Sequence, residues 1–352
     1  MAITLTSLHQ ILDHGFDDII DVRAPAEWGE DHIPGSINLP VLDDEERARI
    51  GTIYKQVNPF TARKMGAALV AQNSARHLQG SLADRPGGWQ PLVYCWRGGQ
   101  RSGSFAMILG QIGWRVETIS GGYKAYRALV VDRLYAQGFP SPVILIDGNT
   151  GSAKTVLLQL LAARGVQVID LEGLARHRGS LFGGMAGGQP SQKSFETGLA
   201  MAVERLDPSR PVVIEAESSK IGQCRVPVSV WKAMLAAPRI EVAASMEARA
   251  RFLVTRYPDL VEDADQLRGV IASLRRLQPA ERLEDWQKLA DAGDFGTLAQ
   301  GLMTHHYDPR YKRNRDQNRE PVAQVELRAM DDADLARAGD ELVRMISRIS
   351  ER

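Results

Sequence analysis

The chain has 352 residues, of which 44% are hydrophobic and 24% charged, a balance typical of folded globular proteins. Its 43 Lys and Arg equal its 43 Asp and Glu, so net charge gives no sign of a nucleic-acid partner, and such binding would need a local basic patch. Two cysteines are too few for a disulfide-stapled fold. We see no membrane-length apolar run and no signal-peptide pattern, so we expect a cytoplasmic protein of about two domains.

The first third of the chain is expected to form strands that alternate with helices. Short apolar runs at 17–22, 91–94 and 116–119 each end at a polar turn. Such strands, separated by helical segments, indicate a mainly parallel sheet covered on both faces. The segment 137–142 carries one Gly and two Pro and is the best linker candidate. We therefore expect a first α/β domain over residues 1–138.

A second α/β domain is expected over residues 139–260. A buried-type strand at 143–146 leads through a Gly-containing turn into a helix at 155–163. Further strands are predicted at 166–169 and 211–214 because both segments are short, apolar and rich in β-branched residues.

The last part of the chain, residues 261–352, is expected to be a helical region that packs on the second domain. One helix face carries apolar residues at helical spacing, and Pro279 should end that helix. These residues are Leu267, Val270, Ile271, Leu274 and Leu277. A second amphipathic helix is predicted near residues 335–349.

The first candidate site is Cys95, which follows the strand at 91–94 and precedes an apolar helical stretch. The carboxyl ends of parallel strands are where open α/β sheets bind ligands. Glycines in the following loop let backbone N–H groups face an anion, and arginines favour thiolate over thiol. The loop residues concerned are Arg97, Gly98, Gly99, Arg101 and Ser102. The pattern predicts a reactive thiolate in an anion-binding loop, with a buried inert cysteine as the alternative.

Two families combine a cysteine with an arginine six positions later, the cysteine phosphatases and the rhodanese-type sulfurtransferases. The phosphatases normally carry His directly before the cysteine, where this chain has Tyr94. The segments DVRAPAEW at 21–28 and HIPGSINLP at 32–40 resemble a rhodanese motif, whose Asp and first Arg brace the fold. The resemblance implies that the cysteine carries sulfur or selenium. Asp31 stands where rhodaneses usually have Gly, and we expect it on a surface turn.

The second candidate site is the segment GNTGSAKT at 148–155, which lies between a predicted strand and a predicted helix, as a P-loop does. Backbone N–H groups would cradle a diphosphate, and Thr155 would be placed to ligate Mg²⁺. The diphosphate-binding residues would be Gly148, Gly151, Ser152, Lys154 and Thr155. Ala153 replaces the usual Gly; we expect no strained dihedral there, but its methyl group puts nucleotide hydrolysis in doubt. A chance Gly-rich turn is the alternative.

Further polar residues are candidates to support the diphosphate or Mg²⁺. Glu215 ends the strand at 211–214 and Glu217 follows two residues later, so a carboxylate there could hold Mg²⁺ directly or through water. A solvated strand-end Glu is the alternative. Asp170, His177 and Arg178 are the other candidates, and we expect no tightly bound metal. The segment 305–315 holds four basic residues and two tyrosines, which suits either a nucleic-acid patch or a solvated face.

Several motifs within residues 15–260 together resemble the tRNA 2-selenouridine synthase family. They are GGYKAYR at 121–127, DLEGLARHRGS at 170–180, QPSQK at 189–193 and EAES at 215–218. The resemblance implies a tRNA substrate with 2-thiouridine at the wobble position, selenophosphate as the selenium donor and geranyl diphosphate as the source of an S-geranyl intermediate. It also implies a covalent selenium adduct on Cys95, and it makes a selenophosphate-supplying enzyme a candidate partner.

Two other functions stay open at this point. A nucleotide-dependent kinase with a rhodanese appendage rests on the P-loop alone, and it predicts that ATP outcompetes geranyl diphosphate. An anion-sensing or scaffold protein would leave Cys95 without chemistry, so that its replacement by Ser would not change tRNA modification.

Overall fold

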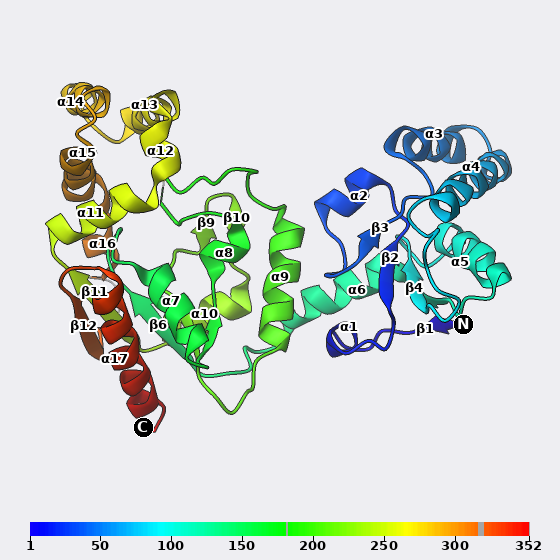
Figure 1. The fold of residues 1–352 in the computed structure, drawn as a ribbon, viewed down its shortest axis with the longest axis horizontal. Coiled ribbons are helices and arrows are strands. Elements are labelled where there is room, and N and C mark those ends of the chain that lie inside the picture. The colour runs from blue at the N-terminus through cyan, green and yellow to red at the C-terminus, as the bar shows by residue number, and fades with distance from the viewer. Residues whose placement is uncertain (181, 316–319, 352) are drawn as a thin grey trace. The chain divides into compact units, whose positions relative to one another are not determined.

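The chain folds into two compact units, each with its own parallel sheet (Figure 1). The computed structural model describes residues 1–180, 182–315 and 320–351, without the side chains of residues 259 and 312–315. The first unit is Met1–Gly138 with Pro190–Arg205, and the second is Phe139–Gln189 with Leu206–Arg352. The α/β class predicted for both parts is confirmed.

The first unit is built on a five-stranded sheet in the order β1-β5-β4-β2-β3, with every neighbouring pair parallel. The strands are β1 (Ala2–Ile3), β2 (Asp18–Asp21), β3 (Ile37–Asn38), β4 (Pro91–Tyr94) and β5 (Glu117–Ile119). The helices are α1 (His9–Leu12), α2 (Pro25–Glu30), α3 (Asp44–Gln56), α4 (Pro59–Gln79), α5 (Gln100–Ile112), α6 (Gly122–Val131), the π-helical turn η1 (Asp132–Ala136) and α9 (Gln192–Glu204). The strands predicted at 17–22, 91–94 and 116–119 are therefore confirmed.

A buried ion pair braces the segment after β2. Arg23 donates from Nη2 to Asp21 Oδ2 over 2.6 Å, and its guanidinium lies 4.0 Å from the ring centroid of Tyr123. Both charged side chains are almost fully buried, which is tolerable because each charge has its partner. The bracing role that the rhodanese resemblance implied for these two residues matches this arrangement.

Asp31 corrects a prediction, because it is buried rather than exposed on a surface turn. It accepts hydrogen bonds from Tyr123 Oη (2.6 Å) and Thr197 Oγ1 (2.9 Å), and burial raises its pKa. Thr197 belongs to α9, and Arg127 of α6 also pairs with Glu196 of α9. These polar contacts explain why α9 belongs to the first unit although elements of the second unit flank it in sequence.

The second unit contains another five-stranded parallel sheet, in the order β12-β11-β6-β8-β7, and a small antiparallel hairpin. The strands are β6 (Val143–Asp147), β7 (Gln167–Ile169), β8 (Val212–Glu215), β9 (Lys220–Ile221), β10 (Cys224–Arg225), β11 (Arg239–Ala244) and β12 (Ala323–Leu327). The helices are α7 (Lys154–Ala163), α8 (Leu171–Ala175), α10 (Val228–Ala236), α11 (Met246–Arg256), α12 (Pro258–Glu262), α13 (Ala264–Ser273), the 3₁₀ turn η2 (Leu274–Arg276), α14 (Ala280–Asp291), α15 (Phe295–Leu302), the π-helical turn η3 (Met303–Tyr307), α16 (Asp308–Arg315) and α17 (Asp332–Ser350).

The C-terminal region was predicted to be helical, but it also contains a strand, β12. β12 pairs with β11 along five residues and extends the sheet of the second unit. Only Val325 and Leu327 of β12 are buried, so this strand carries too little apolar pattern to be recognised from sequence. The amphipathic helix predicted after it is confirmed as α17, which buries Leu335, Leu342 and Ile346 in the core of the second unit.

A separate helical group in the second unit comprises α12 to α15, which Figure 1 shows gathered beyond one end of the sheet. Its core contains Leu267, Ile271 and Trp286. The helix predicted to end before Pro279 is confirmed as α13 with η2, and Pro279 caps the start of α14. None of the described helices combines the length and the apolar character needed to cross a membrane.

Candidate active sites

Cys95 lies directly after β4 in the first unit, and only 4% of it is exposed. Ser102, in the first turn of α5, donates a hydrogen bond from Oγ to Cys95 Sγ over 3.2 Å. Gly98 adopts φ +64°, and a Cβ atom at this position would collide with the carbonyl oxygen of Ile119. The loop can follow this path around the cysteine because position 98 is glycine. The free N–H groups of the first turn of α5 add positive potential at the same place.

The two arginines predicted for this loop have different surroundings. Arg101 donates from Nη1 to Glu27 Oε2 over 2.6 Å, and Arg47 lies 3.6 Å from the same oxygen. Burial alone would raise the pKa of Glu27, but the hydrogen bond and charge of Arg101 hold that pKa below its usual value. Arg97 is exposed and forms no salt bridge with any residue that the structure describes. Of the two loop arginines, Arg97 is therefore the one that stays available to bind an anion, with Gly99 nearby in the loop.

A cavity of about 950 Å³ opens above Cys95. Its walls come from the Cys95 loop and from the helical hairpin of α3 and α4. The basic residues that line it are Arg47, Lys55, Arg63, Lys64, Arg97 and Arg101. The hairpin residues were not predicted from sequence as part of this site, since the basic residues lie far from Cys95 along the chain.

The five predicted diphosphate-binding residues lie together in the loop between β6 and α7 in the second unit. Lys154 Nζ donates to the carbonyl oxygen of Gly148 over 2.8 Å, and the Gly148 N–H donates to Asp147 Oδ1 over 2.7 Å. Gly151 adopts φ +82°, a conformation that L-residues rarely reach. Residues 150–155 line a cavity of about 400 Å³ that is large enough for a diphosphate group.

Ala153 corrects a second prediction, because its backbone is left-handed with φ +59° and ψ +25°. The position therefore requires the conformation for which P-loops use glycine, and the Cβ atom adds a strain of roughly 1–2 kcal/mol. Ala153 is the residue that precedes the first turn of α7, and it lines the diphosphate cavity.

Thr155 is connected by hydrogen bonds to two glutamates in succession. Thr155 Oγ1 donates to Glu172 Oε2 over 2.9 Å, and the Glu172 N–H donates to Glu215 Oε1 over 2.8 Å. Glu215 is fully buried and lies outside the cavity lining, and burial raises its pKa far above the usual value. The solvated strand-end alternative for Glu215 is therefore wrong, and Glu215 positions the start of α8 rather than facing the diphosphate cavity.

Glu172 and Glu217 are the carboxyl groups that interact with the P-loop. Its position two residues after Glu215 made Glu217 a candidate Mg²⁺ ligand, whereas Glu172 was not predicted as part of the site. Burial and the negative charge of Glu172 raise the pKa of Glu217 to about 8. Burial alone would lower the pKa of Lys154. The electrostatic effect of Tyr311 and of the carboxyl groups of Glu217, Glu172 and Asp147 outweighs burial, so the pKa of Lys154 is raised. No group of three His, Cys, Asp or Glu side chains in the described part of the chain is placed to hold a metal ion.

The remaining predicted support residues line the diphosphate cavity. Asp170 lies at its edge, where its side chain accepts the Gly173 N–H over 2.6 Å and so caps α8. His177 is half-buried, and burial lowers its pKa. Arg178 places its guanidinium 4.6 Å from the ring centroid of Tyr257. These residues thus bring one cation and one neutral imidazole to the cavity.

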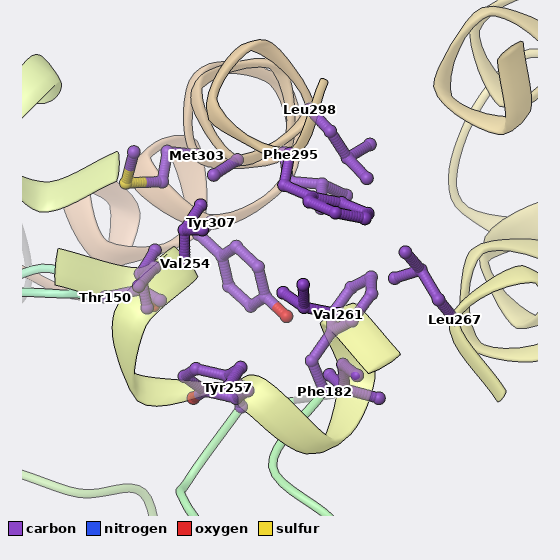
Figure 2. Close-up of a pocket in the computed structure, with 15 residues that line it drawn as sticks. Thr150, Phe182, Val254, Tyr257, Val261, Leu267, Phe295, Leu298, Met303 and Tyr307 are labelled. Carbon is purple, nitrogen blue, oxygen red and sulfur yellow. The ribbon is translucent and has the colours of Figure 1, made fainter. Parts of the chain in front are cut away.

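An apolar cavity adjoins the diphosphate cavity, and the two share Thr150, Ser180, Leu253 and Tyr257 in their linings. Figure 2 shows Phe182, Phe295 and Tyr307 gathered around it. Arg249 fixes the position of Thr150, which lines both cavities, because its Nε and Nη2 donate to the carbonyl oxygen of Thr150 over 2.9 and 2.7 Å. This cavity was not predicted from the sequence because its lining comes from several separate helices.

Within the segment 305–315, the side chains that the structure describes, at 305–311, are only partly accessible. His306 and Tyr307 are buried, and the ring centroid of Tyr311 lies 5.7 Å from Lys154 Nζ, with both residues in the lining of the diphosphate cavity. The three basic side chains predicted at 312–315 lie outside the described residues. The tyrosines of this segment therefore belong to the two cavities of the second unit rather than to an exposed stacking surface.

Comparisons with known proteins agree with this two-unit arrangement. The family model described as "tRNA 2-selenouridine synthase AAA domain" matches residues 141–278, and the "Rhodanese-like domain" model matches residues 4–129. A protein of Alcanivorax borkumensis named tRNA 2-selenouridine synthase is 33% identical over 327 residues, covering 83% of this chain and 88% of its own length. Proteins with the same name are similar in Hahella chejuensis (32% over 325 residues; 83% and 84% covered) and Aeromonas salmonicida (34% over 329 residues; 84% and 87%).

Proposed function

The chain belongs to the tRNA 2-selenouridine synthase family, and from this premise we propose that it replaces the sulfur of a wobble 2-thiouridine in tRNA by selenium in two steps. In the first step, a geranyl group from geranyl diphosphate is placed on the sulfur. In the second, selenophosphate supplies the selenium that displaces the geranylthio group. We assign the first step to the P-loop of the second unit and the second step to the Cys95 loop, in the cytoplasm where tRNA is found.

The observation that carries the first step is the apolar cavity that adjoins the diphosphate cavity. A prenyl diphosphate has one charged and one hydrocarbon end, so it suits an anion cradle that continues into an apolar wall. A nucleoside triphosphate would bring a polar sugar to the same wall. Each CH₂ group buried there contributes about 0.8 kcal/mol, which favours the prenyl compound.

In the geranylation step, the thiouridine sulfur attacks C1 of the geranyl group. The C1–O bond breaks, diphosphate leaves with the bonding electron pair, and the N3 proton of the base goes to solvent. Negative charge grows on the diphosphate, so Lys154 and the N–H groups of the loop stabilise the transition state more than the ground state. The start of α7 adds the positive end of its dipole.

Mg²⁺ suits the residues beside Thr155. Thr155, Glu172 and Glu217 offer only oxygen ligands, which Mg²⁺ prefers. The raised pKa of Glu217 means that one proton is held near two carboxyl groups at neutral pH, and a cation would replace it. When bound, Mg²⁺ would neutralise part of the diphosphate charge, while Lys154 and the loop hold the oxygens.

In the selenium step, the oxidation levels restrict what Cys95 does. Selenophosphate holds selenium as selenide, so attack of Cys95 on selenium would expel phosphorus as a phosphite-level anion, a poor leaving group. A balanced route begins when Cys95 Sγ attacks phosphorus and the P–Se bond breaks, which releases selenide with the bonding electron pair and leaves an S-phosphocysteine that water hydrolyses. The selenide then attacks C2 of the base, the C2–S bond breaks and geranylthiolate leaves, which gives selenouridine.

A competition experiment tests the proposed function against the kinase alternative. Fluorescent geranyl diphosphate is bound to the full chain and displaced by unlabelled geranyl diphosphate, inorganic diphosphate or ATP. The proposal expects geranyl diphosphate to compete best and inorganic diphosphate better than ATP. Displacement by ATP at lower concentration than geranyl diphosphate would overturn it in favour of a nucleotide-dependent enzyme.

A further inference from the structure

The helical hairpin of α3 and α4 is inserted between β3 and β4 of the first unit and lines the cavity above Cys95. The cavity volume of about 950 Å³ is far more than a small tetrahedral anion occupies. Pockets of roughly 300–1,000 Å³ normally hold drug-sized ligands, which are much larger than such an anion. The hairpin therefore encloses space that selenophosphate alone does not fill.

The lining of this cavity is strongly basic. Six basic side chains and no acidic one line it, and the first unit is described in full. Glu27 lies outside the lining and compensates Arg47 and Arg101. Lys55, Arg63 and Lys64 are exposed, and no salt bridge to them occurs among the described residues. The hairpin thus presents uncompensated positive charge to a polyanion.

The tip of the hairpin also presents aromatic side chains to solvent. Tyr54 is 55% exposed and Phe60 is 68% exposed, and both line the cavity. Asn58 stiffens the tip, because its Oδ1 accepts the N–H groups of Phe60 (2.7 Å) and Thr61 (3.2 Å). Exposed rings on an ordered backbone are typical of surfaces that stack on unpaired bases, since little conformational freedom is lost on binding.

We propose that this hairpin is the docking surface for the anticodon loop of the substrate tRNA, an inference that rests on the proposed function. Bases that flank the wobble position stack on Tyr54 and Phe60, while Lys55, Arg63 and Lys64 neutralise the loop phosphates. The wobble base enters the cavity and reaches the Cys95 loop. A protein partner would favour a surface with fewer charges at its centre, so the uncompensated basic residues favour RNA.

Binding of the full chain to an anticodon stem-loop RNA with wobble 2-thiouridine tests this surface. The triple variant Lys55→Ala, Arg63→Ala, Lys64→Ala should weaken binding and lower the salt dependence, by about 0.7 in the log–log slope per lost phosphate contact. The double variant Tyr54→Ala, Phe60→Ala should weaken binding about tenfold or more and leave that slope unchanged. A blunt RNA duplex with the same stem should not respond to the aromatic substitutions.

Matched controls use exposed residues outside the cavity lining. Arg49→Ala, on α3, and Met107→Ala, 67% exposed on α5, should bind the stem-loop like the wild type. Thermal unfolding should be the same for all variants because every replaced side chain is exposed.

The outcomes separate this inference from the proposed function. If the wild type geranylates and selenates the RNA but both hairpin variants bind it with wild-type affinity, the docking surface is wrong and the function stands. If the hairpin variants lose RNA binding while the wild type makes neither product from geranyl diphosphate and selenophosphate, the surface stands and the function is wrong. Loss of binding only to a selenophosphate-supplying protein would also overturn the RNA assignment.

Discussion

The Cys95 loop and the P-loop occupy the same kind of place in their two sheets. Each follows a buried parallel strand, β4 or β6, and leads into the first turn of a helix, α5 or α7. Each thus combines free N–H groups with the positive end of a helix dipole. Their surroundings differ: the first opens into a wide basic cavity, whereas the second holds a buried lysine among carboxyl groups and adjoins an apolar cavity.

The difference shows that the walls around an anion loop, rather than the loop itself, select the substrate. Uncompensated cations and exposed rings around Cys95 suit RNA and a small anion. Around Lys154, the carboxyl groups limit the net positive charge, and aromatic and aliphatic side chains accept hydrocarbon. If the two centres are separate in function, a substitution at one centre should leave the reaction at the other unchanged.

The largest effect is expected for Lys154→Ala. Loss of the cation at the diphosphate should slow geranylation about a hundredfold to a thousandfold, as for other single groups that stabilise transition-state charge. Selenation of an RNA that already carries S-geranyl-2-thiouridine should keep its rate, because that step uses the Cys95 loop. Mass spectrometry of the nucleosides measures both, and Lys232→Ala, an exposed lysine on α10, is the matched control. Equal loss of both steps would mean that the centres are not separate.

Filling the apolar cavity should weaken binding of the hydrocarbon end of the prenyl diphosphate and leave binding of its diphosphate end unchanged. Ala299, on α15, lines this cavity but not the diphosphate cavity. Ala299→Phe should weaken geranyl diphosphate binding about tenfold or more, since the added ring takes the space of the chain. Calorimetry should find unchanged affinity for inorganic diphosphate, which serves as the internal control. Unchanged affinity for geranyl diphosphate would place the hydrocarbon elsewhere.

The carboxyl groups of the second unit should make its stability depend on pH. Glu217, with a pKa of about 8, keeps its proton in the folded state where the unfolded chain has already lost it above about pH 4.5. The free energy of unfolding should therefore fall as pH rises from about 4.5 to about 8. Urea unfolding should show a shallower fall for Glu217→Gln, because the other buried carboxyl groups with raised pKa, Glu215 and Asp31, still contribute. Exposed Glu247→Gln should keep the wild-type slope. If the free energy of unfolding of Glu217→Gln fell with pH as steeply as that of the wild type, Glu217 would not be the group responsible.

The smallest effect is expected for Ala153→Gly. Relief of the left-handed strain, roughly 1–2 kcal/mol, is partly offset by about 0.4–1 kcal/mol of extra freedom in the unfolded chain. The variant should thus be more stable by roughly 0.5–1 kcal/mol in denaturant unfolding. A less stable variant would show that the alanine is not strained at this position.

Local sequence patterns predicted the two loops and most strands because each is a continuous segment. Strand, glycines and charged residues lie within a few positions of Cys95 and of Lys154. The α/β class followed from the alternation of short apolar runs with helical segments. These features need no knowledge of which distant parts of the chain meet.

Features assembled from distant segments were not predicted. Asp31 is buried because Tyr123 and Thr197, far along the chain, supply its hydrogen-bond partners. Ala153 lies in a continuous loop, but its left-handed backbone follows from the path of the whole loop and could not be inferred from the residue type. β12 is recognisable only beside β11. The apolar cavity and the α3–α4 hairpin likewise depend on tertiary contacts.

The product formed by Cys95→Ala tests the central claim most directly. The variant is incubated with 2-thiouridine tRNA, geranyl diphosphate and selenophosphate, and the wobble nucleosides are identified by mass spectrometry. Separate centres predict that S-geranyl-2-thiouridine accumulates at the wild-type rate of geranylation and that no 2-selenouridine forms. Unmodified 2-thiouridine as the main product, or 2-selenouridine at the wild-type level, would contradict the account.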